Sequence, residues 1–195
     1  MEVDKLLINQ ALDYLDKSAY MSKASFKMME QYYIKMLWVD KIIPITLEIL
    51  NVGIFTYLLT VRSGDILIIL FGLIFSIFQI GFSKFTENLD FYSEKELSRC
   101  NGNEFRKLVY EFKIIIQDIV IYPNCDLNYK KNELIKLIKK YEELSDNVNL
   151  INNKAIKEAN KAINVSKDFI TDTDVVMSRY FDENICLKIK NKLGG

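Results

Sequence analysis

The sequence contains no histidine among its 195 residues. This absence removes the usual general base, the imidazole ligand of zinc sites and the side chain that titrates near neutral pH. The chain also has no excess of either charge, because Lys+Arg and Asp+Glu both number 26. Nucleic-acid binding therefore has no electrostatic support, and we expect no nucleic-acid partner.

Cysteine is scarce and is spaced without a pattern. The three cysteines, Cys100, Cys125 and Cys186, form no C-x-x-C pair, and their number is odd. Neither a disulfide framework nor a cysteine metal site follows from such spacing. We interpret them as reduced thiols on a cytosolic part of the protein.

Glycine is also scarce, with 7 residues in the chain, and none forms a phosphate-binding loop. Gly102 is isolated, and Gly53, Gly64, Gly72 and Gly81 lie in or between apolar runs. The serines have no histidine to activate them and no Gly-x-Ser-x-Gly turn. We therefore predict that the protein is not an enzyme and has no catalytic residues, no cofactor and no metal site.

Long apolar runs are what the sequence does have. Ile42 to Val61 and Ile66 to Phe82 are joined by the short polar link Arg62-Ser63-Gly64-Asp65. The runs are about 20 and about 17 residues long, or about 30 and 26 Å as helices, which is enough to cross a hydrocarbon core. They predict a transmembrane helical hairpin, because lipid leaves no partner for free backbone groups. The alternative is a pair of helices buried in a soluble α-helical protein.

The regions on both sides of the hairpin have helical periodicity. We predict an all-α membrane protein with three parts: an N-terminal amphipathic, cytosolic or interfacial helix (1–41), the transmembrane hairpin (42–85) and a cytosolic helical region (86–195). In the last part we expect a break at Cys100–Asn103, with Asn103 capping a helix that Pro123 ends. Further helices are predicted over Leu127–Leu144, over Ala155–Ile163, and from an N-cap in Thr171–Asp174 to beyond Ile189.

Basic residues predict the orientation of the hairpin. The link carries only Arg62, offset by Asp65, whereas lysine and arginine are frequent before and after the two runs. The positive-inside rule then places both termini in the cytoplasm and the link outside. The flanking basic residues are Lys23, Lys27, Lys35, Lys41, Lys84, Lys95, Arg99 and Arg106.

Four polar residues inside the runs are the candidate functional residues: Glu48, Asn51, Ser76 and Gln79. Folding the hairpin about Ser63–Gly64 places Glu48 level with Gln79 and Asn51 level with Ser76. A carboxylate at the centre of a membrane helix costs about 2.5–3.5 kcal/mol, so Glu48 needs a partner, water or a function. Either these residues bond one another and hold one hairpin together, or they line an aqueous path in an oligomer.

Small and polar residues continue as a stripe along the second run. Gly72, Ser76, Gln79 and Ser83 form a surface on which membrane helices approach closely. Because one hairpin has too few helices to enclose water, the aqueous-path hypothesis requires a homo-oligomer. Before the first run, Tyr32, Tyr33 and Trp38 fit an interfacial anchor or, equally, an ordinary packing stripe.

The order of these parts resembles a known family. A Tyr- and Lys-bearing helix (19–34), a tight hairpin and a helical tail with Glu142–Ser145 and Ala155–Ala159 look like the SLATT family. These are two-transmembrane effectors associated with SMODS nucleotidyltransferases and SLOG sensors in bacterial conflict systems. The resemblance is one of architecture, and the family has no invariant catalytic residues to carry over.

The resemblance implies a membrane effector of bacterial antiviral defence. Such a protein would be a multi-pass protein of the inner membrane that forms homo-oligomers and a pore, and permeabilises the bilayer when an upstream nucleotide-signalling or sensor protein activates it. Two alternatives remain from the residues themselves. The chain could be a membrane-tethered helical scaffold that recruits a cytosolic partner, or a small subunit of a transport complex.

Overall fold

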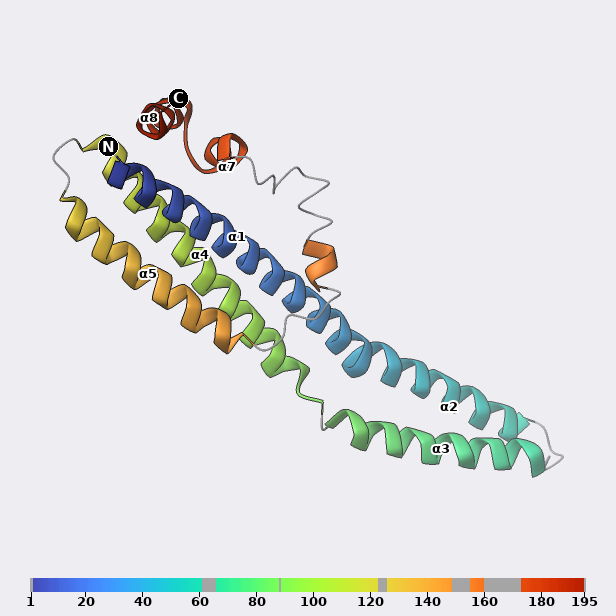
Figure 1. Cartoon of the computed structure of the whole chain (residues 1–195). Helices are drawn as coiled ribbons and strands as arrows, with labels where there is room; N and C mark the ends of the chain where they lie inside the picture. The colour runs from blue at the N-terminus through green and yellow to red at the C-terminus, as the bar shows by residue number, and fades with distance from the viewer. Residues whose placement is uncertain are drawn as a thin grey trace. The chain divides into compact units, whose positions relative to one another are not determined.

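All regular elements that the structure describes are helical (Figure 1). The computed structural model describes residues 2–60, 66–87, 89–122, 126–148, 155–159 and 173–194. The prediction of an all-α fold is confirmed for these residues. The predicted link Arg62–Asp65, the helix end at Pro123, Cys125, residues 160–163 and Thr171–Asp172 lie outside them.

The elements follow one another along the chain as a series of helices of very different lengths. They are α1 (Glu2–Leu37), η1 (Trp38–Ile42), α2 (Ile43–Thr60), α3 (Ile66–Glu87), α4 (Phe91–Ile121), α5 (Leu127–Asn147), a short helical segment at 155–159, α7 (Thr173–Tyr180) and α8 (Glu183–Leu193).

The helices divide into two compact units. The helical unit comprises Met1–Met29 and Leu97–Gly195, and the hairpin unit comprises Glu30–Glu96. This division differs from the three consecutive parts predicted from the sequence, because the N-terminal helix and the C-terminal region share one core.

The core of the helical unit forms where α1, α4 and α5 lie side by side (Figure 1). Tyr14 stacks on Phe112 with ring centroids 6.0 Å apart, and Tyr141 meets the edges of both Tyr14 and Phe105. Residues from all three helices are buried here at the three- and four-residue spacing that the sequence predicts. They include Leu7, Ala11, Leu15, Phe105, Leu108, Phe112, Ile116, Ile119 and Leu134.

Small residues bring α1 and α4 close together. The buried Ser22 hydroxyl donates a hydrogen bond of 2.8 Å to the backbone carbonyl of Gly102. A Cβ at Gly102 would lie 3.1 Å from the ring of Phe26. The break predicted at Cys100–Asn103 is wrong: α4 continues through it, and Asn103 lies inside the helix rather than at its start.

The predicted helix over Leu127–Leu144 is confirmed as α5. Asp126 caps its N-terminus, and its carboxylate accepts from the backbone N–H groups of Asn128 and Tyr129. The single final helix is wrong: α7 ends at Tyr180, and Asp182 caps a separate α8 by accepting from the Ile185 N–H at 2.9 Å.

In the hairpin unit, α2 and α3 coincide closely with the two apolar runs. The five-residue π-helical turn η1 precedes α2, in which Pro44 is the second residue. Proline has no N–H, and its ring presses on the carbonyl four residues earlier, which here belongs to Asp40 in η1. The wider π turn is a recognised way for a helix to accommodate such a disturbance.

Candidate functional site in the hairpin unit

Asn51 and Gln79 join the two helices of the hairpin. The Asn51 side-chain amide donates a short hydrogen bond to Oε1 of Gln79, and both side chains are half-buried. Folding the hairpin about Ser63–Gly64 predicts Glu48, not Asn51, level with Gln79. The observed partner is therefore one helical turn further along α2 than expected.

Glu48 lies outside this contact. Its side chain is exposed, and it makes no hydrogen bond or ion pair with any residue that the structure describes. The neighbouring turns of α2 expose large apolar side chains: Ile45 is 54% exposed and Ile49 is 65% exposed. Glu48 is thus a carboxylate on an apolar, outward-facing surface.

Ser76 also faces away from α2. It is exposed, and its hydroxyl donates to the carbonyl of Gly72 in its own helix at 2.9 Å. Of the predicted small and polar stripe, Gly72 and Gln79 are half-buried against α2, whereas Ser76 and Ser83 are exposed. A Cβ at Gly72 would meet Ile54 at 3.4 Å, which is ordinary contact and shows how near α2 lies.

The four candidate residues therefore do not form one cluster. Asn51 and Gln79 bond each other, as the hairpin-holding hypothesis expected of polar residues on facing helices. Glu48 and Ser76 point out of the hairpin instead. The bond shown is between Asn51 and Gln79, and the aqueous-path hypothesis remains a prediction for Glu48 and Ser76.

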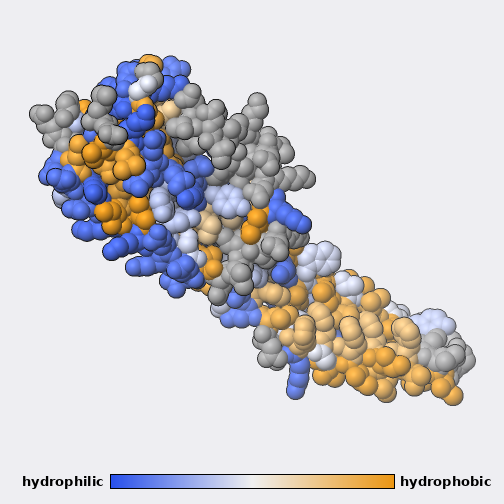
Figure 2. Space-filling view, in the orientation of Figure 1, coloured by the Kyte–Doolittle hydropathy of each residue, from blue (hydrophilic) through white to orange (hydrophobic). Residues whose placement is uncertain are grey.

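The outer surface of the hairpin is apolar. Phe55, Phe71, Ile77 and Ile80 are each more than 60% exposed, and Figure 2 shows orange, hydrophobic side chains over α2 and α3. Exposed apolar surface of this extent marks contact with a membrane or with protein.

One helix among the described residues is long and apolar enough to cross a membrane. The candidate stretch begins at Ile69 and extends past the end of α3 to Ile121, and its most apolar window of 18 residues has a mean hydropathy of 1.6 with no buried residue. The apolar part of that stretch is α3, since α4 is rich in charge. The second span, and with it the transmembrane hairpin, remains a prediction.

The aromatic residues before α2 are of two kinds. The ring of Tyr32 packs on that of Phe91, with centroids 6.4 Å apart, and Lys35 Nζ lies 5.0 Å from the Tyr32 ring centroid. Tyr33 and Trp38 are about half exposed. Tyr32 is therefore a packing residue, and Tyr33 and Trp38 are left in positions that fit an interfacial anchor.

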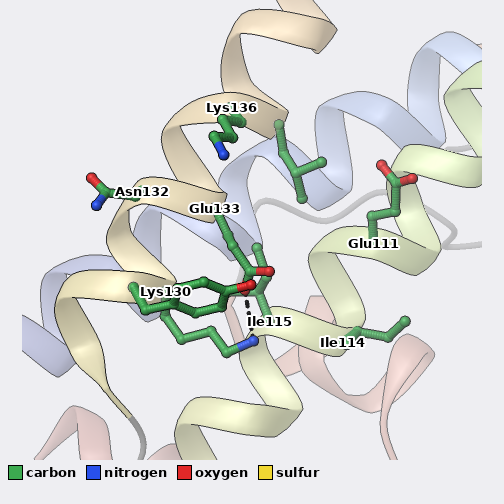
Figure 3. Close-up of a pocket in the computed structure, with 9 residues that line it drawn as sticks. Glu111, Ile114, Ile115, Lys130, Asn132, Glu133 and Lys136 are labelled. Carbon is green, nitrogen blue, oxygen red and sulfur yellow. Dashed lines mark hydrogen bonds and ion pairs between the residues drawn. The ribbon is translucent and has the colours of Figure 1, made fainter.

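A groove of about 470 Å³ lies between α4 and α5. Lys130 and Glu133 point toward each other in it (Figure 3), and Lys130 Nζ lies 2.7 Å from Glu133 and 2.8 Å from Asp118 of α4. Burial lowers the pKa of Lys130, but its hydrogen bonds to these two carboxylates outweigh burial and raise it.

This groove is an interhelical ion-pair site. The lysines of α5 lie in two environments. Lys131, Lys136 and Lys139 are exposed, whereas Lys130 is half-buried and forms an ion pair with Asp118 of α4. Within the described residues, no group of three or more acidic, cysteine or histidine side chains is placed to hold a metal ion.

A second group of residues was not predicted from the sequence, and it comes from α1, from α4 and from the C-terminal end of α7. Lys23, Arg106, Lys113 and Arg179 line one groove, yet they are distant in sequence and come from three helices. In the sequence, Lys23 and Arg106 are recognisable only as basic residues that flank the apolar runs. No motif connects these residues, so only the fold reveals the site.

Comparison with known proteins gives no relative. No protein-family model, no curated protein and no solved structure matches this chain.

Proposed function

We propose that the protein is a membrane effector that spans a bacterial inner membrane with α2 and α3 and permeabilises it as a homo-oligomer. The observation that carries the proposal is Glu48, an exposed carboxylate without a partner in the described structure, on an apolar surface. A carboxylate facing lipid near the bilayer centre costs about 2.5–3.5 kcal/mol.

Assembly of several copies removes this cost. In an oligomer, Glu48 faces a neighbouring copy or an enclosed water path instead of lipid. Two helices are too few to surround water, so a path lined by Glu48 requires several hairpins. The Asn51–Gln79 bond supports this arrangement, because it stabilises each hairpin without using Glu48.

The resemblance to the SLATT family supplies the biological setting of the proposal. In that setting both termini are cytoplasmic, and an upstream nucleotide-signalling or sensor protein of an antiviral defence system triggers opening. The helical unit receives the trigger, and the hairpin unit acts on the bilayer.

Three versions of residue 48 test the proposal. Glu48→Gln preserves shape and removes the charge, so it should insert normally and alter ion preference or conductance. Glu48→Leu should insert at least as well as the wild type, because the free-energy cost of placing a carboxylate in lipid disappears. It should also abolish most permeabilisation, because an apolar side chain excludes water from the path. The measurement is propidium iodide entry and membrane potential per unit of inserted protein during controlled expression in bacteria.

Thr56→Leu is the matched control. Thr56 is also exposed on α2, two turns further along, and its hydroxyl donates to the Val52 carbonyl of its own helix. This control should permeabilise like the wild type. If all four versions permeabilise equally at matched insertion, Glu48 has no role in the mechanism. If the wild type itself does not permeabilise the membrane, the scaffold or transport-subunit interpretation replaces the pore.

A further inference from the structure

A second concave site lies in the helical unit, and we call it the basic groove. It has a volume of about 480 Å³, within the range of small-molecule sites. Three helices form its walls: α1 provides Ala19, Ser22, Lys23 and Phe26, α4 provides Arg106, Val109, Tyr110 and Lys113, and α7 provides Arg179 and Tyr180.

The charge of the basic groove is one-sided. Four of its ten lining residues are cationic and none is acidic, although the chain as a whole has zero net charge. The carboxylate that interacts electrostatically with Arg179 and Lys23 belongs to Asp16, which is half-buried. Burial raises the pKa of Asp16, and these two cations lower it in part. The positive charge of the groove therefore rests mainly on Arg106 and Lys113 of α4.

The cations on α4 are held against aromatic rings. The Arg106 guanidinium carbon lies 4.7 Å from the ring centroid of Phe26, and Lys113 Nζ lies 5.7 Å from that of Phe181. Neither cation has an ion pair or hydrogen bond within the described residues. A ring fixes the position of a cation without neutralising it, so both keep their donors for a ligand.

Aromatic side chains complete the site. Tyr110 is 60% exposed at the groove, and Tyr180 lines it from α7. An exposed aromatic ring beside several cations offers a flat stacking surface next to phosphate-binding groups. Arginine adds a planar fork of donors that matches the geometry of phosphate oxygens.

From these observations, the geometry points to a binding site for a small molecule that carries a diphosphate group. Its phosphates contact Arg106, Lys113 and the two other cations. The same chemistry is present in inorganic pyrophosphate and in a nucleoside diphosphate, and Tyr110 distinguishes the two, because only the nucleoside has a base to stack. This inference concerns the helical unit and does not depend on the proposed function of the hairpin.

Binding has a structural consequence for α7. This helix contributes Arg179 and Tyr180, whereas the other walls belong to the long helices α1 and α4. A ligand that contacts all three walls ties α7 to them. Amide hydrogens in Thr173–Tyr180 should therefore exchange more slowly when the ligand is present.

The test uses the purified full chain in detergent micelles, with pyrophosphate and ADP as probes and calorimetric titration as the measurement. The wild type should bind at least one of the two. Arg106→Gln combined with Lys113→Gln should weaken binding at least about tenfold, because charge-assisted hydrogen bonds are lost. Slower amide exchange in α7 upon ligand addition should accompany binding.

The matched control is Lys131→Gln combined with Lys139→Gln. It removes the same charge from exposed positions on α5 and should leave binding unchanged. If the α4 pair loses helix content, the exposed Lys23→Gln is measured in its place and should also weaken binding. If the site is built for a nucleotide, Tyr110→Ser should weaken the binding of ADP but not that of pyrophosphate. If the site is built for an inorganic ligand, Tyr110→Ser should leave the binding of both probes unchanged.

Three outcomes overturn the inference. The first is no binding of either probe at millimolar concentration. The second is equal weakening by the α4 pair and the α5 pair, which would mean attraction by overall charge only. The third is sulfate binding as tightly as pyrophosphate, which would mean an adventitious anion only.

Discussion

At the scale of single residues, polar side chains of the hairpin separate by environment rather than by type. Glu48 and Asn51 are three positions apart on α2, yet Asn51 bonds Gln79 and Glu48 faces outward. Three residues of an α-helix rotate by about 300°, so Glu48 lies about 60° around the helix from Asn51, which is enough to move it from the contact face to its flank. Identifying the polar residues from sequence was therefore easier than predicting their partners.

The Asn51–Gln79 bond should contribute modestly to hairpin stability. Interhelical hydrogen bonds in membranes contribute about 0.6 kcal/mol on average and up to about 1.7 kcal/mol. Asn51→Leu and Gln79→Leu should each lower the free energy of unfolding of the hairpin. The double variant should lose less free energy than the sum of the losses in the two single variants. The measurement is a double-mutant cycle on unfolding in mixed micelles; strict additivity would show that the bond contributes nothing.

A second residue-scale prediction concerns Asp4 and Lys192, which join α1 to α8. Lys192 Nζ lies 3.0 Å from the Asp4 carboxylate, and this hydrogen bond lowers the pKa of Asp4 below its ordinary 3.8. The stability it provides is present above pH 3.8 and is lost as the pH falls through the lowered value. Asp4→Asn should cost about 0.5 kcal/mol at pH 7 and progressively less in acid.

The measurement is the free energy of unfolding at several pH values, followed by circular dichroism. Lys192→Met serves as the control, because it removes the same pair from the other side and should show the same pH dependence. A loss in Asp4→Asn that stays constant down to pH 2 would refute this role for the pair.

At the scale of elements, the continuity of α4 shows how packing overrides local preference. Asn101-Gly102-Asn103 favours a break, since glycine and asparagine are poor helix formers. In the fold, the same Gly102 lets α1 approach, and its carbonyl accepts from Ser22. The contact partner lies 80 residues earlier, so nothing near Gly102 in the sequence announces it.

Enlarging residue 102 should therefore weaken the contact between α1 and α4. Gly102→Leu forces a side chain against Phe26 and should lower stability by about 1–3 kcal/mol, as overpacking does. Gly81→Leu is the control, because nothing lies within 4 Å of its new Cβ and the site is exposed in the hairpin. Thermal unfolding measures both; equal melting temperatures would contradict the close approach.

At the end of the chain the error is the opposite one, because the sequence predicted a continuous helix where the structure has a break. Apolar residues from Val175 to Ile189 keep a helical spacing and predicted one helix, but Asp182 caps a new one after Phe181. The aspartate was visible in the sequence, although an uninterrupted apolar pattern outweighed it. Both errors arise because periodicity predicts which face is buried more reliably than where a helix ends.

At the scale of the whole molecule, composition predicted the helical class and the two apolar helices. It did not predict that Met1–Met29 and Leu97–Gly195 form one unit, because the contacts that join them bridge the entire hairpin sequence. It did not predict the basic groove for the same reason. Local patterns report on neighbours in the chain, whereas both features depend on helices distant in sequence.

The whole-molecule prediction is that both termini are cytoplasmic. Cys100 is exposed in the helical unit, so it provides a position-specific probe. In a version with Cys125→Ser and Cys186→Ser, a membrane-impermeant maleimide should not label intact cells and should label after lysis. A reporter that works only in the periplasm should likewise stay silent when fused after Gly195; labelling of intact cells would reverse the orientation.

The π-helical turn η1 also determines where the chain tolerates a change in length. A π turn takes up one residue more than an α turn in nearly the same rotation, whereas each α-helical residue advances the chain by about 100°. Deleting Val39 together with Pro44→Ala should therefore yield a continuous α-helix that keeps Glu48 on its present side. Deleting Thr46, which lies inside α2, would instead rotate Glu48 by about 100° around the helix relative to Tyr33. A change of one residue in chain length therefore leaves the direction of Glu48 unchanged in η1 but alters it in α2.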